Sequence, residues 1–201
     1  MATKTLRQAI DDVKTLVDDD DLTDAEVTNW LMEALVDLAP IMRREAKTTI
    51  TLAKDKADYT SADGLPTDLM IPFAARLDTE DDVISEIPVG DFLSDGFKWW
   101  NDTLTMQPTP SKARTLTLWY YRWPTILTYL QTSSQMDIME QFQHLPILYA
   151  AAKTQQRDEE LEDKTDFMAD YLTGKAMMER FITQRQQRKR SGRIIARRPL
   201  Y

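Results

Sequence analysis

Residues 102–124 read DTLTMQPTPSKARTLTLWYYRWP, and this stretch determines the fold class that we expect. Leu104 and Met106 alternate with polar side chains, with the period of two that is typical of a half-buried strand. Leu116 and Leu118 repeat the alternation after a PTPS segment, whose prolines cannot continue a strand and suit a loop. The pattern predicts a β-hairpin whose leucine and methionine side chains face a core.

The second strand of this hairpin ends in aromatic side chains on both of its faces. Trp119, Tyr121 and Trp123 point to one side, and Tyr120 points to the other. A strand that is apolar on both faces is typical of one that is covered on both sides. Helical patterns occupy both ends of the chain, so we expect an α+β fold. It should contain an N-terminal helix hairpin, a small antiparallel β region with a hairpin, and C-terminal helices that end in an extended basic arm.

Composition and charge limit the possible functions. A chain of 201 residues can form one domain with a substantial core, and the absence of cysteine excludes disulfides, thiolate nucleophiles and cysteine-ligated metals. No apolar run approaches the ~18 residues of a membrane span, and the N-terminal MATKTLR lacks a signal-peptide core, so we expect a soluble product made in the cytoplasm. The net charge is −8, but the last 17 residues carry seven basic side chains and no acidic one. The other residues, with 18 basic and 33 acidic side chains, should repel nucleic acid, whereas the tail suits nucleic acid or an acidic protein groove.

Two helices are expected before the β region. Apolar side chains recur at helical spacing over residues 5–17 and 27–42. The TDAE segment that starts at Thr23 is a capping box for the second helix, and Pro40 should kink this helix or end its regular part. The acidic run Asp18–Asp21 is interpreted as a solvated loop rather than a cation site, because no glycine-turned loop with spaced oxygen ligands follows it.

The middle of the chain predicts one small sheet of four to six strands. Besides the hairpin, the expected strands are Thr48–Leu52, Asp58–Tyr59, Leu69–Leu77 (interrupted by Pro72) and Val83–Ile87. Residues 88–93 are expected to form a short helix.

The helical pattern returns at Leu145, with Pro146 in the first helical turn. We expect a break near Arg157–Glu160 rather than one continuous helix to Ile182, because helices far longer than about a dozen residues are unusual in compact domains. After Gln184 the apolar pattern stops, and a Ser-Gly pair should end any helix there. The expected organisation is a single α+β domain at 1–184, helical at 1–47 and 136–184 and β-rich at 48–127, followed by a basic C-terminal arm at 185–201.

The sequence offers no constellation of residues that supports catalysis. The single histidine, His144, precedes a predicted helix and is interpreted as a helix-entry or packing residue, with a catalytic base as the alternative. Neither a Gly-x-Ser-x-Gly elbow nor a glycine-rich phosphate loop is present. The acidic residues within 158–163 lie in a polar run with nothing apolar to raise a pKa, so they read as a solvated helix face. We expect no enzyme, no metal site and no cofactor.

Aromatic side chains gather in and just before the predicted hairpin. Such rings can stack on single-stranded bases, but only Lys98 and Arg122 accompany them in an acidic body. Packing in the core or at a subunit interface is therefore the preferred interpretation. The residues concerned are Trp99, Trp100, Trp119, Tyr121 and Trp123.

Four features together resemble the head-to-tail connector adaptors of tailed bacteriophages, also called head-completion or gatekeeper proteins. They are the helix that opens TDAEVTNWLMEA at Thr23, an LPTD turn at Leu65, an aromatic strand that ends at Pro124, and a helix led by Pro146. The likeness runs over nearly the whole chain, and its motifs are patterns of residue type rather than chemical signatures.

The resemblance implies a structural virion protein without catalytic residues. Such adaptors form a ring, usually of twelve copies, beneath the portal in the neck, and the genome passes through the lumen. The implied partners are the portal protein, a tail or nozzle protein and further copies of the chain; double-stranded DNA passes without specific binding. An acidic body suits this channel, because phosphate contacts would otherwise bind the passing DNA strongly. We expect the arm to dock on the portal through Arg185, Arg188, Lys189, Arg190, Arg193, Ile194, Ile195, Arg197, Arg198, Leu200 and Tyr201.

Three alternatives remain open at this point. A nucleic-acid-binding regulatory protein could use the arginine-rich tail, and its DNA affinity would depend steeply on salt. The second alternative is a different structural protein of a virion, such as a tail-completion subunit. A small hydrolase is disfavoured, because no nucleophile, phosphate loop or ligand cluster is present.

Overall fold

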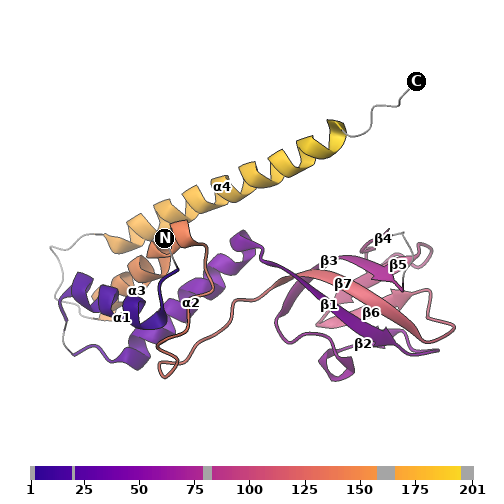
Figure 1. Cartoon of the computed structure of the whole chain (residues 1–201), viewed down its shortest axis with the longest axis horizontal. Coiled ribbons are helices and arrows are strands. Elements are labelled where there is room, and N and C mark those ends of the chain that lie inside the picture. Colours follow the sequence, from indigo (N-terminus) through magenta and orange to yellow (C-terminus); the bar gives the residue numbers. More distant parts are fainter. Residues whose placement is uncertain (1–2, 20, 79–82, 158–165, 196–201) are drawn as a thin grey trace. The chain divides into compact units, whose positions relative to one another are not determined.

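The computed structural model describes residues 3–19, 21–78, 83–157 and 166–195. It has an α+β fold, as expected, and divides into two compact units (Figure 1). Residues 1–42 and 124–201 make up a helical unit, and residues 43–123 make up a β unit.

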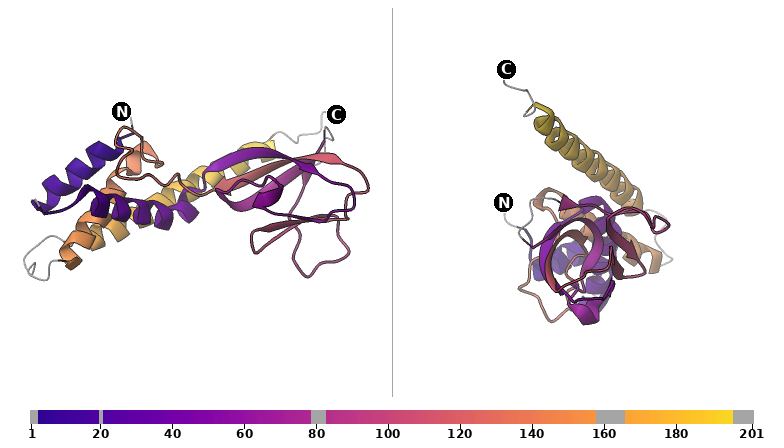
Figure 2. Two further views of the ribbon diagram at one scale, coloured as in Figure 1. Left: turned by 90° about the horizontal axis from the view of Figure 1, so that it is seen from below. Right: turned by 90° about the vertical axis from the view of Figure 1, so that its right-hand side faces the viewer.

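The helical unit contains the expected N-terminal helix pair, α1 (Leu6–Val17) and α2 (Asp24–Met42), followed by α3 (His144–Arg157) and α4 (Phe167–Ile195). A single 3-10 turn, Glu140–Phe142, precedes α3. Helix α3 contacts each of the other three helices (Figure 2). The core of this unit is built from the apolar faces of all four helices.

Local sequence signals set the helix starts. The predicted capping box is confirmed: the Glu26 N–H donates to Thr23 Oγ1 at 3.2 Å, and the Thr23 N–H donates to the Glu26 carboxylate at 3.1 Å. Thr5 and Gln8 form a second capping box at the start of α1. Each box satisfies N–H groups that a helix start otherwise leaves unpaired.

The prediction of two separate C-terminal helices is confirmed, whereas the predicted position of the break, near Arg157–Glu160, falls mostly on residues outside the described part. Helix α3 ends at Arg157 and α4 begins at Phe167, with residues 158–165 outside the described part. The two helices pack closely because Gly174 has no side chain: a Cβ there would lie 2.3 Å from Cδ2 of the buried Leu145. This glycine, in the first half of α4, is therefore a packing residue.

The prediction that the chain is extended from residue 185 is wrong for residues 185–195, which continue α4. Ser191 and Gly192 do not end the helix. Each disfavours a helix by only about 0.5–1 kcal/mol, and the arginine, lysine and glutamine residues before them are strong helix formers. Residues 196–201 lie outside the described part of the chain.

The β unit consists of two sheets packed on one core, where one sheet of four to six strands was predicted. The four-stranded sheet has the order β1-β7-β3-β4 and the three-stranded sheet the order β2-β6-β5. Within the described residues the strands are β1 (Glu45–Leu52), β2 (Asp58–Tyr59), β3 (Leu69–Leu77), β4 (Val83–Ile84), β5 (Gly96–Trp100), β6 (Thr103–Gln107) and β7 (Arg114–Arg122). All pairings between these strands are antiparallel.

The predicted hairpin between β6 and β7 is wrong, because the two strands belong to different sheets. Strand β6 pairs with β5, and β7 lies between β1 and β3. The predicted inward face is correct: Leu104, Met106, Leu116 and Leu118 are all buried in the shared core. The alternation of apolar and polar residues determines which face of each strand is buried. It does not determine which strands pair, because two sheets that face one core bury the same side chains as a single hairpin would.

The hairpin that does form joins β5 to β6 through Asn101 and Asp102. Both residues have positive φ, 49° and 55°, as a two-residue turn between twisted strands requires. The short helix predicted at 88–93 is also wrong, since this segment forms turns and bends. The Asp91 carboxylate accepts hydrogen bonds from the N–H groups of Leu93 and Ser94, which offers this backbone an alternative to a helix.

Candidate functional site

The residues considered for chemistry are His144 and the acidic runs at 18–21 and 158–163. His144 is the first residue of α3, and its side chain is exposed. Within the described ranges, no group of three or more His, Cys, Asp or Glu side chains could hold a metal ion. In the acidic run, Asp18 caps α1 in a left-handed conformation, and Asp19 pairs with Arg157 at 2.6 Å. Residues 158–163, which were expected to be a solvated helix face, lie outside the described part.

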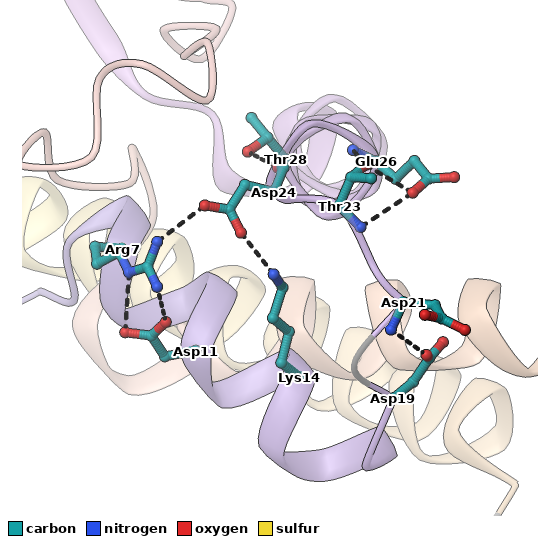
Figure 3. A network of polar contacts seen from close by, with 9 residues as sticks. All are labelled: Arg7, Asp11, Lys14, Asp19, Asp21, Thr23, Asp24, Glu26 and Thr28. Carbon is teal, nitrogen blue, oxygen red and sulfur yellow. Dashed lines mark hydrogen bonds and ion pairs between the residues drawn. The ribbon is translucent and has the colours of Figure 1, made fainter.

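Asp24, the first residue of α2, joins α1 to α2 (Figure 3). Its two carboxylate oxygens accept from Lys14 Nζ at 2.7 Å and from Arg7 Nη1 at 2.9 Å, and Arg7 also pairs with Asp11. The hydrogen bond from Lys14 is the main cause that holds the pKa of Asp24 below its usual value, against a raising effect of burial. A carboxylate in the first turn also complements the helix dipole.

Arg157, the last residue of α3, forms ion pairs with the connection between α1 and α2 and with the first turn of α2. Its guanidinium lies 2.6 Å from the Asp19 carboxylate and 3.9 Å from the Glu26 carboxylate. Glu26 already belongs to the capping box, so one carboxylate serves the start of α2 and the contact with α3. Apolar packing and these polar contacts together therefore stabilise the helical unit.

Asp37 of α2 holds the first half of α4. The Tyr171 hydroxyl donates to its carboxylate, and Lys175 Nζ donates to the same oxygen at 2.5 Å. Burial alone would raise the pKa of Asp37, but the hydrogen bonds from Lys175 and Tyr171 lower it below its usual value. Burial, helped by the hydrogen bond to Asp37, raises the pKa of Tyr171 far above its usual value, so this hydroxyl stays a donor. The Tyr171 ring also meets the Tyr149 ring edge-on at 5.1 Å.

The second half of α4 leaves the helical core. The last buried residue described on this helix is Ile182, and Arg185 is exposed. Figure 1 shows the yellow end of α4 extending past the other helices of its unit. Of the residues expected to bind the portal, Arg188, Lys189, Arg190, Arg193, Ile194 and Ile195 lie on this part of the helix. Arg197, Arg198, Leu200 and Tyr201 lie outside the described part of the chain.

An open groove of about 580 Å³ runs beside α2 in the helical unit. Its rim carries the carboxylates of Glu33 and Asp37, and its apolar lining includes Val36, Ile126 and Tyr149. Both carboxylates already accept hydrogen bonds within the unit, from Tyr149 and from Tyr171 and Lys175 respectively. Both negative charges of the groove are therefore already partly satisfied within the unit, and neither is fully available to a partner.

None of the five aromatic residues singled out from the sequence is fully buried. Trp100 and Trp123 are 71% and 38% exposed, and Trp99, Trp119 and Tyr121 are half-buried. Trp99 packs against the core of the β unit from its edge.

Trp119 and Tyr121 lie on the outer face of the four-stranded sheet, opposite the buried Tyr120. Lys47 Nζ lies 5.5 Å from the centre of the Trp119 ring, and the Arg76 guanidinium carbon lies 5.9 Å from it. Sequence reasoning missed both cations, because they come from β1 and β3, far from Trp119 in the chain. Only the strand register, which places Lys47 opposite Trp119, could have revealed such a contact.

Comparison with known proteins gives one family. The model of the family described as SU10 adaptor protein matches residues 4–198, nearly the whole chain. A search of curated proteins found no match. Within the described residues, no helix is long and apolar enough to span a membrane.

Proposed function

The chain belongs to the SU10 adaptor protein family, and on this basis we propose that it is the structural head-to-tail adaptor of a tailed-phage virion. In this proposal several copies, usually twelve, form a ring beneath the portal in the neck, connect the capsid to the tail and line the channel for DNA ejection. The observation that carries it is the family match over residues 4–198, which agrees with the resemblance seen in the sequence.

The protein acts as a connector and not as an enzyme in this proposal. This part of the proposal rests on the family match and on the sequence, which holds neither a Gly-x-Ser-x-Gly elbow nor a glycine-rich phosphate loop. The acidic body suits a channel that double-stranded DNA must pass without binding, because phosphate contacts would slow its passage.

The second half of α4 and the arm attach each copy to the portal. Helix α4 carries its basic residues past the helical core, and Arg185 is exposed there. Arginine suits this role because its planar guanidinium binds carboxylates through two hydrogen bonds. A single exposed ion pair contributes only about 0–1 kcal/mol, so several arms of one ring must act together.

Deletion of residues 185–201 tests the attachment. The buried α4 residues Phe167, Tyr171, Met178 and Ile182 all precede the deletion, so the melting temperature of the remaining chain should stay within a few degrees of wild type. Portal binding, measured by co-sedimentation, should be lost. A full-length control with the seven basic residues changed to glutamine keeps good helix formers and should also lose binding. A truncated protein that still completes heads at the normal rate would refute the role of the arm.

A nucleic-acid-binding regulator is the second candidate, and the concentration of seven basic residues in the last 17 favours it. It requires DNA affinity of the isolated protein that falls steeply with salt. An adaptor should show weak DNA binding at physiological salt.

A further inference from the structure

The loop of residues 88–95, between β4 and β5, holds large apolar side chains in water. Phe92 is 79% exposed and Leu93 is 96% exposed. The loop is nevertheless tied down: the Asp91 carboxylate accepts from the N–H groups of Leu93 and Ser94 at 2.9 and 3.1 Å, and Gln107 Nε2 donates to the Ser94 carbonyl at 2.9 Å. Since an ordered backbone imposes this exposure, the two side chains form a preformed apolar tip.

Two exposed acidic side chains flank this tip. Glu86 precedes the loop and Asp95 ends it. Neither side chain has an ion-pair or hydrogen-bond partner among the residues that the structure describes. Lys98 is buried, and its Nζ lies 4.4 Å from the centre of the Phe92 ring. The tip therefore presents apolar surface together with negative charge.

The outer face of the four-stranded sheet has the opposite character. Ile71 and Phe73 of β3 are 47% and 38% exposed, and the Phe73 ring lies 4.7 Å from the Tyr121 ring. Beside them, Lys47 and Arg76 both approach Trp119.

Neither of these two cations has a carboxylate partner in the described part of the chain. Lys47 is exposed, whereas Arg76 is half-buried and its Nε is fully buried, so Lys47 is the more accessible of the two. Among the described residues, the face therefore presents apolar and aromatic surface together with the positive charges of Lys47 and Arg76, with the exposed Glu45 at its edge opposite Tyr121.

We propose that the 88–95 loop of one copy docks on this outer sheet face of the next copy. Phe92 and Leu93 cover Ile71 and Phe73 in this contact, and the acidic flanks of the loop meet the two cations beside Trp119. The loop does not cover the face of its own copy, because Leu93 is 96% exposed and Phe92 is 79% exposed. The contact joins two different surfaces of one chain, and such head-to-tail contacts close into rings when the rotation allows. The inference rests on the proposed ring and assigns the surfaces that build it.

Disulfide trapping tests the contact directly, because the chain has no native cysteine. The double variant Leu93→Cys, Phe73→Cys is assembled with portal into the neck complex and oxidised gently. A ladder of covalent multimers that reaches ring size is expected. The matched control, Leu93→Cys with Leu130→Cys, places the second cysteine at a site that is 75% exposed in the helical unit and should give no ladder.

The outcomes separate this inference from the proposed function. Rings that assemble normally without a ladder overturn the contact and leave the ring proposal standing. If the wild-type protein never forms a ring, both the proposed contact and the proposed ring are refuted.

A charge exchange provides a second test that does not depend on cysteine chemistry. Lys47→Glu should weaken the association between copies by at least about tenfold, and adding Asp95→Lys should restore it, because the exchange returns opposite charges to the two sides. An unchanged melting temperature of each free variant shows that folding is intact. Absence of rescue together with absence of the ladder would overturn the contact.

Discussion

The hydroxyl of Tyr171 offers a sharp test of how α4 is held. This side chain is 2% exposed and donates to the Asp37 carboxylate. A hydrogen bond to a charged group contributes about 1.5–3 kcal/mol in proteins. The Asp37 side chain is 43% exposed and keeps Lys175, so water partly replaces the lost donor, and we expect Tyr171→Phe to cost about 1–2 kcal/mol.

The assay is urea unfolding followed by the far-ultraviolet circular dichroism of the helices. Tyr149→Phe is the matched control, because its hydroxyl makes a longer hydrogen bond, 3.4 Å to Glu33, in an exposed setting. It should change stability by less than about 0.5 kcal/mol. Equal effects of the two substitutions would refute the claim that Asp37 and Tyr171 hold α4.

The pH dependence of this effect follows from the lowered pKa of Asp37. A carboxylate whose pKa is lower in the folded state adds stability that is fully present above its unfolded pKa, near 3.8, and is lost as the pH falls through the folded value. The difference between wild type and Tyr171→Phe should therefore be complete at neutral pH and shrink in acid below that value. A difference that grows in acid would contradict the assignment.

Three further predictions, at Gly174, Thr23 and Leu118, test the packing and the capping. Gly174→Ala should destabilise the wild type through its clash with Leu145, although alanine favours a helix by about 1 kcal/mol; in a Leu145→Ala background it should stabilise, and the same sign in both backgrounds would refute the close approach of the two helices. Thr23→Ala should lower the free energy of unfolding by about 0.5–2 kcal/mol, measured by thermal unfolding, and Thr23→Ser should lower it much less, because serine keeps the capping hydroxyl. Equal losses for the two substitutions would refute the role of the capping box. Leu118→Ala, at a fully buried site, should cost about 2–5 kcal/mol, whereas Trp100→Ala, at a site 71% exposed, should cost less than about 1 kcal/mol; the reverse order would show that the core of the β unit is misplaced.

The helices could be predicted from the sequence because their signals are local. The capping box at Thr23 and the apolar periods on either side of it lie within a few residues of the structure they specify. The separation of α3 from α4 was predictable for the same reason, since a polar run separates two apolar series. The end of α4 was not, because Ser191 and Gly192 only weaken a helix whose other residues favour it.

Strand pairing could not be predicted because it depends on residues far apart in the chain. The alternation around Leu104 and Leu116 identified the buried faces correctly but did not say which strands are neighbours. The most specific local signal was the Asn101-Asp102 turn, which lies between β5 and β6 rather than in the proline-containing loop.

The candidate surfaces could likewise be predicted where their signals are local, but not where they depend on strands distant in the chain. The aromatic cluster around Trp119 was visible in the sequence, whereas the two cations on its ring come from strands distant in the chain. The exposure of Phe92 and Leu93 was hidden, because an apolar pair in an acidic segment fits a short amphipathic helix equally well.

The mass of the protein in solution, alone and after mixing with portal, tests the central claim most directly. A head-to-tail adaptor should give a closed ring of about twelve copies of the 23.3 kDa chain, either by itself or only on the portal. A stable dimer that ignores the portal and binds DNA with a steep salt dependence would contradict the adaptor function.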